Sequence, residues 1–209
     1  MASKNDRIKL ALFRKLEEAK RTGDKESTIE SAWNDAIRDW LSMEVGGHAV
    51  SFNHAVEGGA KTTDGVTTVH TDTTDFSVLL EAKRDIDLAD PVSRSRPLAE
   101  AAHYCWQCLE NGAHVPDAVV IADVDEIVVV SAKWLLPYVS DGKWGWAESS
   151  ASAMQANDPL VDELASDKNL HTVHVEKALA EDGSRSETFD FDWFMRAVER
   201  AAKQTPPSA

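Results

Sequence analysis

Apolar residues recur at helical spacing over the first part of the chain. Ile29, Trp33 and Ile37 carry large apolar side chains at intervals of four residues, which is typical of a helix that buries one face. The preceding segment has similar spacing, with many lysine and arginine residues between its apolar positions. We therefore predict helices over residues 6–21 and 27–43.

Further along, the pattern changes to that of strands. Residues 75–83 alternate between two faces, so that Glu81 and Lys83 point to the same side. Residues 118–122 and 127–131 are almost wholly apolar, which suits central strands that are covered on both faces. We predict strands over residues 48–56, 66–70, 75–83, 118–122, 127–131 and 171–177.

Helices are also predicted between and after these strands. Residues 98–111 have a helical pattern, whereas residues 84–97 contain two prolines and are predicted to form a loop. A short helix is expected near residues 158–165 and a final amphipathic helix over residues 190–203. This order of elements predicts an α/β (α+β) fold, with a central mixed β-sheet flanked by helices.

The length favours a single domain. A chain of 209 residues can form one good core but not two large domains. We expect the domain to span residues 1–203, with its core at about residues 27–131 and a C-terminal elaboration over residues 132–203. The Pro-containing segment 204–209 is predicted to be a tail.

Composition and charge restrict the class of protein. The net charge is −14, which argues against a free-standing, non-specific nucleic-acid binder. No apolar run approaches the length of a membrane span, so no membrane partner is expected. The first residues lack the apolar stretch of a secretory signal, and we therefore expect a cytoplasmic protein.

A Cys-X-X-Cys pattern lies within the predicted helix 98–111. Cys105 and Cys108 share one face of that helix, but a structural zinc ion normally needs four ligands. Cysteine is also among the residue types that are most often buried. We therefore expect two buried thiols rather than a zinc site.

The strongest candidate for chemistry is the segment that contains Glu81 and Lys83. Their spacing places a carboxylate and an ammonium group on one side of a strand, and Asp75 lies just upstream. Converging carboxylates can bind Mg²⁺, while water and phosphate fill its other positions. A neighbouring lysine can orient the water or stabilise developing negative charge. These groups are the minimum for phosphodiester hydrolysis, although the same pair could be a solvated strand face.

These residues, with a helix before them and a helix–strand unit after them, resemble the PD-(D/E)XK nuclease superfamily. The resemblance covers about residues 27–131 and is strongest to the nuclease domains of restriction-modification enzymes. It implies a restriction-endonuclease-like sheet and a cofactor, Mg²⁺ or Mn²⁺, bound by Asp75 and Glu81, with Lys83 near the attacking water. In many relatives a Glu from the early helix also holds the metal, and Glu30 matches it here.

The sequence departs from the family pattern at its first acid. Asp75 follows Thr rather than Pro, and only five residues separate it from Glu81. On a straight strand this spacing spans about 20 Å, which is too far to share one metal ion. Either the chain bends between them, or another acid, Asp72 or Asp64, completes the site.

Three further residues are assigned roles with plain structural alternatives. Arg84 follows the motif and could bind phosphate, or it could belong to a solvated loop. Many relatives carry Gln-X-X-X-Tyr on the next helix; here Tyr104 precedes Gln107, which is kept as a substrate-binding candidate. Glu30 has an alternative role as the acid of a capping box that begins at Ser27.

The resemblance implies a Mg²⁺-dependent endodeoxyribonuclease that hydrolyses DNA and belongs to a restriction or defence system. Because the chain is acidic, we expect a methyltransferase or translocase subunit to deliver the DNA. One alternative is an inactive nuclease-fold module that serves in binding or assembly. Another is an acidic inhibitor that mimics DNA.

Overall fold

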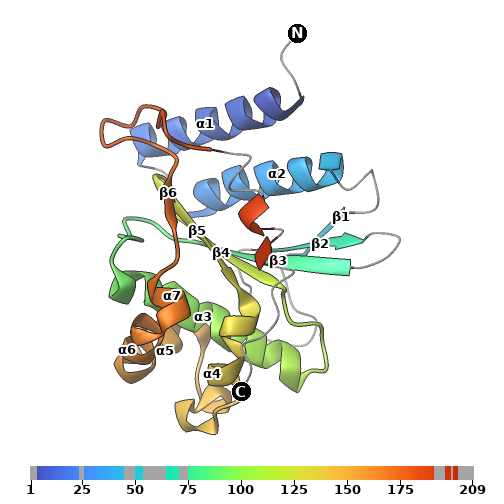
Figure 1. The fold of residues 1–209 in the computed structure, drawn as a ribbon, viewed down its shortest axis with the longest axis vertical. Coiled ribbons are helices and arrows are strands. Elements are labelled where there is room, and N and C mark those ends of the chain that lie inside the picture. The colour runs from blue at the N-terminus through green and yellow to red at the C-terminus, as the bar shows by residue number, and fades with distance from the viewer. Residues whose placement is uncertain are drawn as a thin grey trace.

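A computed structural model describes residues 4–23, 26–44, 50–53, 65–70, 75–190, 196–198 and 200–201. Six strands form one sheet, in which their spatial order follows their order along the chain. The strands are β1 (Val50–Asn53), β2 (Gly65–His70), β3 (Asp75–Ala82), β4 (Ala118–Ala122), β5 (Glu126–Ser131) and β6 (Val175–Lys177). This sheet lies at the centre of the ribbon drawing (Figure 1).

The sheet is mixed. Strands β3 and β4 are parallel, and the other four neighbouring pairs are antiparallel. A parallel pair needs a crossover connection, which is supplied here by α3 (Pro91–Glu110). The predicted α/β class with a central mixed sheet flanked by helices is therefore confirmed.

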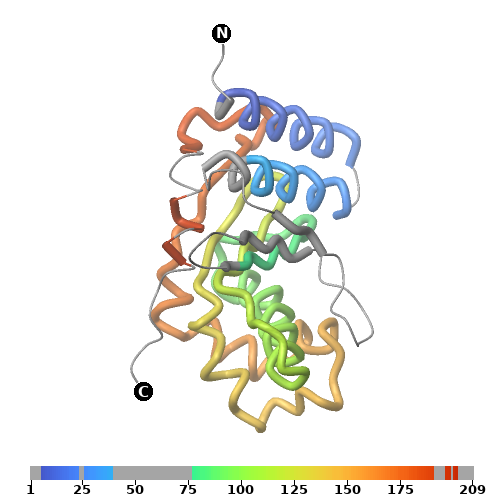
Figure 2. Tube along the Cα trace, turned by 90° about the vertical axis from the view of Figure 1, so that its right-hand side faces the viewer, coloured from blue at the N-terminus to red at the C-terminus, as the bar shows by residue number. Residues whose placement is uncertain are grey.

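Helices cover both faces of the sheet. Above the sheet in Figure 1 lie α1 (Lys4–Thr22) and α2 (Glu26–Glu44), and below it lies α3. Figure 2 shows the same layers from the side. Apolar residues of α1 and α2 pack with the face that carries Val78 and Leu80, as the four-residue spacing predicts.

The segment after β5 completes the second core, on the face that α3 covers. Leu79 of β3 packs there with apolar residues of α3 and of the later helices. Those later helices are α4 (Leu136–Val139), α5 (Ala151–Gln155), α6 (Asp158–Ser166) and α7 (Lys168–His171). Three short 3₁₀ turns lie between β5 and α5, at Ala132–Trp134, Gly142–Trp144 and Trp146–Glu148.

The crossover helix is longer than the sequence predicts. It begins at Pro91, seven residues before the expected start, and Asp90 caps it by accepting a hydrogen bond from the Ser93 amide. Proline is favoured in the first turn of a helix, where its missing N–H needs no partner. Pro97 lies inside the helix, so part of the predicted loop is helical and the prediction was wrong there.

Other boundaries differ by smaller amounts. Helix α2 begins at Glu26, so Ser27 lies inside its first turn rather than at the predicted cap. The predicted strand 171–177 is shorter as β6. Most of the predicted final helix and all of the tail 204–209 lie outside the described residues, although 196–198 and 200–201 are helical.

A buried arginine fastens the start of α3 to the later helices. The Arg94 guanidinium donates to the carbonyl oxygens of Leu88 at 2.5 Å, Leu170 at 3.1 Å and His171 at 3.1 Å. Only 2% of Arg94 is exposed. Arg94 therefore links the loop that follows β3 to the residues at the end of α7.

No helix in the described part of the chain is long and apolar enough to cross a membrane. Cys105 and Cys108 are both free and buried, as the sequence predicts. Burial raises the pKa of each thiol above its usual value, which opposes formation of the reactive thiolate.

Candidate functional site

Glu81 and Lys83 lie at the end of β3, on the face that α3 covers. Alternation along the strand puts Leu80 and Ala82 in the opposite core, so Glu81 shares the α3 side with Leu79. The Glu81 side chain is 2% exposed and that of Lys83 is 15% exposed. The Lys83 Nζ atom lies 3.6 Å from Glu81 Oε2. The two motif residues are thus together, in a site shielded from water.

A second carboxylate reaches this site from α3. Glu100 Oε2 lies 2.7 Å from Lys83 Nζ, and the Glu100 side chain is 16% exposed. The same oxygen accepts a hydrogen bond of 2.7 Å from Gln155 Nε2 of α5. Lys83 therefore lies between carboxylates of a strand and a helix that come from different parts of the sequence.

Tyr104 follows Glu100 by one helical turn. Burial raises the pKa of its hydroxyl above the usual value, and Cys108, Cys105 and the Glu81 carboxylate act in the same direction. The phenol therefore remains protonated at neutral pH. In the Gln-X-X-X-Tyr pattern a glutamine lies four residues before the tyrosine. Here Glu100 occupies that position, and it was not among the predicted site residues. That spacing was the signal that could have identified Glu100.

The structure does not bring Asp75 to Glu81. Asp75 begins β3, and every residue from Asp75 to Leu80 is paired with β2 in one continuous register. Without a bend or bulge, six residues of strand span about 20 Å. The described β3 therefore lacks the bend that Asp75 and Glu81 would need in order to share one metal ion.

The other two candidate acids, Asp72 and Asp64, lie outside the described residues. The described part of β2 begins at Gly65. Gly65, which follows Asp64 in the chain, is paired with Leu80, which precedes Glu81. Of the two acids, Asp64 is therefore the one whose chain neighbour is paired beside the motif.

The remaining predicted residues lie on α2, on the loop after β3 and on α3. Glu30 is half-buried on α2, which packs on the opposite face of the sheet from α3. Arg84 is exposed and forms an ion pair of 3.2 Å with Asp85. Gln107 is half-buried on α3, two helical turns or about 10 Å beyond Glu100.

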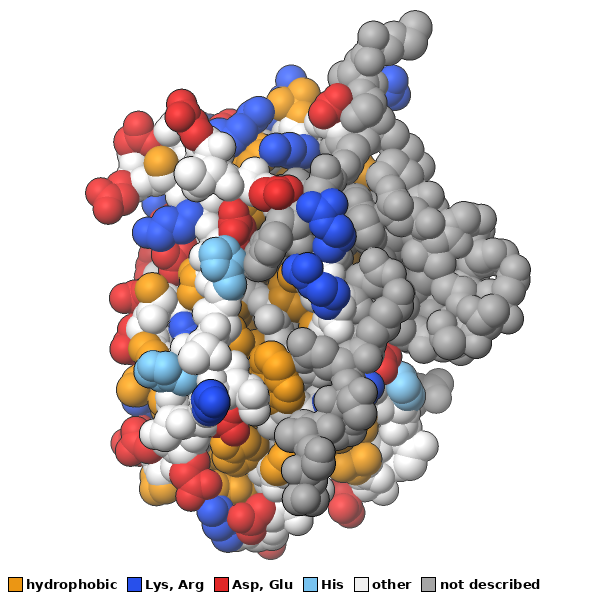
Figure 3. Space-filling view, in the orientation of Figure 1, with side chains coloured by type: hydrophobic (Ala, Val, Ile, Leu, Met, Phe, Trp, Pro, Cys, Tyr) orange, Lys and Arg blue, Asp and Glu red, His pale blue; other side chains and the backbone are white. Residues whose placement is uncertain are grey.

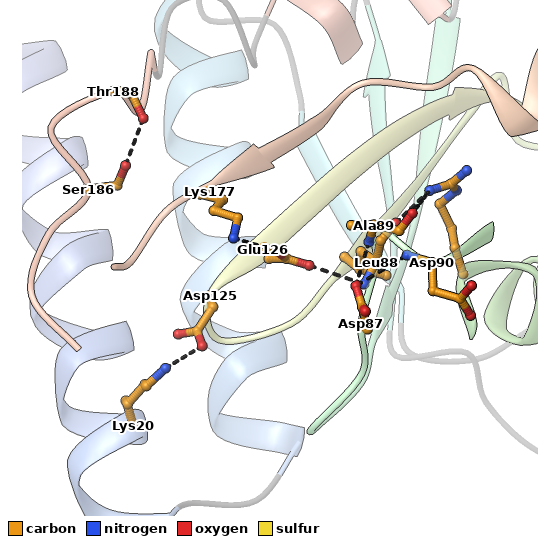
Figure 4. Close-up of polar contacts among 11 residues, drawn as sticks. Lys20, Asp87, Leu88, Ala89, Asp90, Asp125, Glu126, Lys177, Ser186 and Thr188 are labelled. Carbon is orange, nitrogen blue, oxygen red and sulfur yellow. Dashed lines mark hydrogen bonds and ion pairs between the residues drawn. The ribbon is translucent and has the colours of Figure 1, made fainter. Parts of the chain in front are cut away.

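A second group of acids lies where β3 and β4 end (Figure 4). Asp125 forms an ion pair with Lys20, and Glu126 lies 3.5 Å from Lys177. Glu126 also accepts a hydrogen bond of 3.1 Å from the Leu88 amide. Asp87, Asp125 and Glu126 line a cavity of about 570 Å³.

The buried member of this group is Asp123, which is 5% exposed. Burial raises the pKa of its carboxyl, while hydrogen bonds from the amides of Ile86 and Val124 act in the opposite direction. Asp123 and Glu126 thus bind amides of the loop that follows β3. These hydrogen bonds give both carboxylates a structural role, because they hold that loop against the ends of β4 and β5.

The described residues supply only part of a metal site. No three His, Cys, Asp or Glu side chains come together as a metal-binding group within the described ranges. Glu81 offers carboxylate oxygens, the ligand type that Mg²⁺ prefers, and this ion commonly uses one or two carboxylates with water and phosphate. The residues therefore fit a Mg²⁺ ion that takes further ligands from another acid and from the substrate.

Comparison with known proteins adds no relative. No family model matches the chain, and no match was found among curated proteins or among solved structures.

Proposed function

We propose that this chain is a Mg²⁺-dependent endonuclease that hydrolyses DNA, of the PD-(D/E)XK type. The observation that carries the proposal is the pairing of Glu81 and Lys83 at the end of a strand, shielded from water and facing a helix. The arrangement of α2, β3, α3 and β4 agrees with what the resemblance implies, namely a mixed sheet with flanking helices.

Each residue has a distinct part in the proposed reaction. Mg²⁺ would polarise the phosphate and lower the pKa of a bound water. Glu81 would hold that ion, and Asp64 is our first choice for the second acid. The Lys83 ammonium would orient the water or stabilise charge on the phosphate, and such an interaction is stronger where water is excluded. Arg84 is exposed on the adjacent loop and remains a candidate for phosphate binding.

The acidity of the chain bears on how DNA would reach this site. On the face in Figure 3, acidic side chains are frequent along the left-hand edge, and lysine and arginine side chains lie among them. A net charge of −14 disfavours approach of a polyanion at low salt. We therefore propose that a methyltransferase or translocase subunit assists DNA binding.

One observation favours a second function, that of an inactive nuclease-fold module. Asp75 is six residues from Glu81 along a regular strand. The described site therefore contains Glu81 without Asp75 as a second metal-binding acid. A module that cannot bind metal could still act in assembly, or as an acidic inhibitor that mimics DNA.

Titration with Mn²⁺, followed by a cleavage assay, separates these functions. We expect the full chain to bind Mn²⁺ by isothermal titration calorimetry and Glu81→Gln to lose most of that binding. End-labelled duplex DNA should be cut only in Mg²⁺ or Mn²⁺, and EDTA should stop the cutting. Absence of both binding and cleavage would favour the module.

A further inference from the structure

Of the two described carboxylates beside Lys83, the nearer one belongs to a residue outside the sequence motif. Its ammonium lies 2.7 Å from Glu100, within hydrogen-bond distance, but 3.6 Å from Glu81, which is beyond it. Lysine has a long flexible side chain, and ordering it costs conformational entropy. A buried carboxylate at hydrogen-bond distance compensates for that cost and fixes where the ammonium lies.

Glu100 is itself held from its other side. Gln155 Nε2 donates to the Glu100 oxygen that accepts from Lys83, at 2.7 Å in both cases. The backbone carbonyl of Gln155 accepts a hydrogen bond of 2.7 Å from Arg96, which is one turn before Glu100 on α3. Gln155 is therefore fastened to α3 through both its backbone and its side chain.

We propose that Glu100 is a positioning residue that places the Lys83 ammonium for the reaction, and that Gln155 fixes the Glu100 carboxylate. This role rests on the proposed nuclease function. It allows Glu81 to bind a cation while Lys83 keeps an anionic partner. It also makes α5, in the C-terminal elaboration, a contributor to a site whose motif lies on β3.

The experiment compares plasmid cleavage by the full-length wild type, Glu100→Gln and Gln155→Ala in Mg²⁺. We expect Glu100→Gln to lower kcat by about 10- to 100-fold, the range seen when a partner that orients an active group is removed. The KM for DNA and the affinity for Mn²⁺ should stay near wild type, because a positioning role gives Glu100 no contact with DNA or metal. Gln155→Ala should lower kcat in the same direction by a smaller factor.

A second readout does not depend on activity. Brief acetylation with acetic anhydride, quantified by mass spectrometry, reports the reactivity of Lys83 relative to the exposed Lys168. Lys83 should react faster in Glu100→Gln than in the wild type. Ser152→Ala, an exposed change on the same helix as Gln155, is the matched control and should leave kcat and labelling unchanged. Thermal unfolding of each variant controls for loss of the fold.

The possible results are distinct. If the wild type cleaves DNA and Glu100→Gln keeps its kcat, the positioning role is wrong and the nuclease proposal stands. A parallel loss of Mn²⁺ affinity or a raised KM would mean that Glu100 touches metal or DNA, which also overturns the positioning role. If the wild type cleaves in neither metal, the proposed function fails and this role fails with it.

Discussion

The Glu100 carboxylate lies 2.7 Å from the Lys83 ammonium, although one residue is on helix α3 and the other follows strand β3. The crossover from β3 to β4 runs α3 back along the sheet and so produces this contact. The site therefore combines the end of β3 with α3, and Gln155 of α5 adds a third segment through its hydrogen bond to Glu100.

The first prediction concerns Glu81. Glu81→Gln keeps the shape of the side chain but removes the charge that a divalent cation needs. We expect cleavage to fall by at least about 100-fold, since a ligand of the ion that stabilises the transition state is lost. Cleavage is measured in Mg²⁺ and again in Mn²⁺. Activity close to wild type would show that Glu81 binds no essential metal.

The second prediction separates the candidate acids. Asp64→Asn should abolish cleavage, because β2 pairs Gly65 with Leu80 directly before Glu81. Asp75→Asn should leave cleavage close to wild type, because a regular strand keeps Asp75 about 20 Å from Glu81. Asp72→Asn tests the remaining candidate acid and should cleave more than Asp64→Asn. The reverse ranking of Asp64 and Asp75 would contradict the proposed site.

The third prediction concerns the buried Arg94. Replacing it by methionine leaves the carbonyls of Leu88, Leu170 and His171 without their donor. We expect the free energy of unfolding to fall by about 3 kcal/mol, since buried acceptors that lose a charged donor are costly. Urea denaturation measures the change. Arg94→Lys, which retains the charge without the planar fork, should fall between wild type and Arg94→Met.

The fourth prediction is a pH dependence at the cap of α3. Hydrogen bonds from the amide and hydroxyl of Ser93 lower the pKa of Asp90 below its usual value of 3.8. A carboxyl with a lowered pKa in the folded state stabilises the fold above its unfolded pKa. That contribution is lost as the pH falls through the folded pKa.

Thermal unfolding of wild type and Asp90→Ala therefore should differ at pH 7 and converge well below pH 3.8, the reference pKa of this carboxyl. Asp90→Asn, which still accepts a hydrogen bond, is the control and should lose less stability at pH 7. An Asp90→Ala deficit that persists unchanged in acid would show that the carboxylate charge has no part in the cap.

Local patterns predicted the elements of the fold well. The four-residue spacing of Ile29 and Trp33 marked the buried face of α2, and alternation over residues 75–83 placed Glu81 and Lys83 on one side of β3. Both follow from the periods of helix and strand, which a sequence states directly. The start of α3 was missed because Pro97 is usually a helix breaker, whereas Asp90 and Pro91 cap and begin a helix here.

The missing parts of the site depend on contacts between distant segments. Glu100 faces Lys83 only because the parallel pairing of β3 with β4 sets α3 across that face of the sheet. Gln155 reaches Glu100 from a helix that begins 41 residues after α3 ends. No local period encodes such contacts. The position of Asp75, six residues before Glu81 on a strand in continuous register with β2, is likewise set by strand pairing rather than by a local pattern.

The most direct test of the central claim is cleavage of supercoiled plasmid DNA by the purified full chain in Mg²⁺ or Mn²⁺. Lys83→Ala is the test variant, and Lys168→Ala, at an exposed position on α7, is the matched control. The nuclease proposal predicts metal-dependent nicking or linearisation by wild type and Lys168→Ala, with none in EDTA or in Lys83→Ala. Folded protein that cuts in neither metal, or cleavage that survives Lys83→Ala, would contradict it.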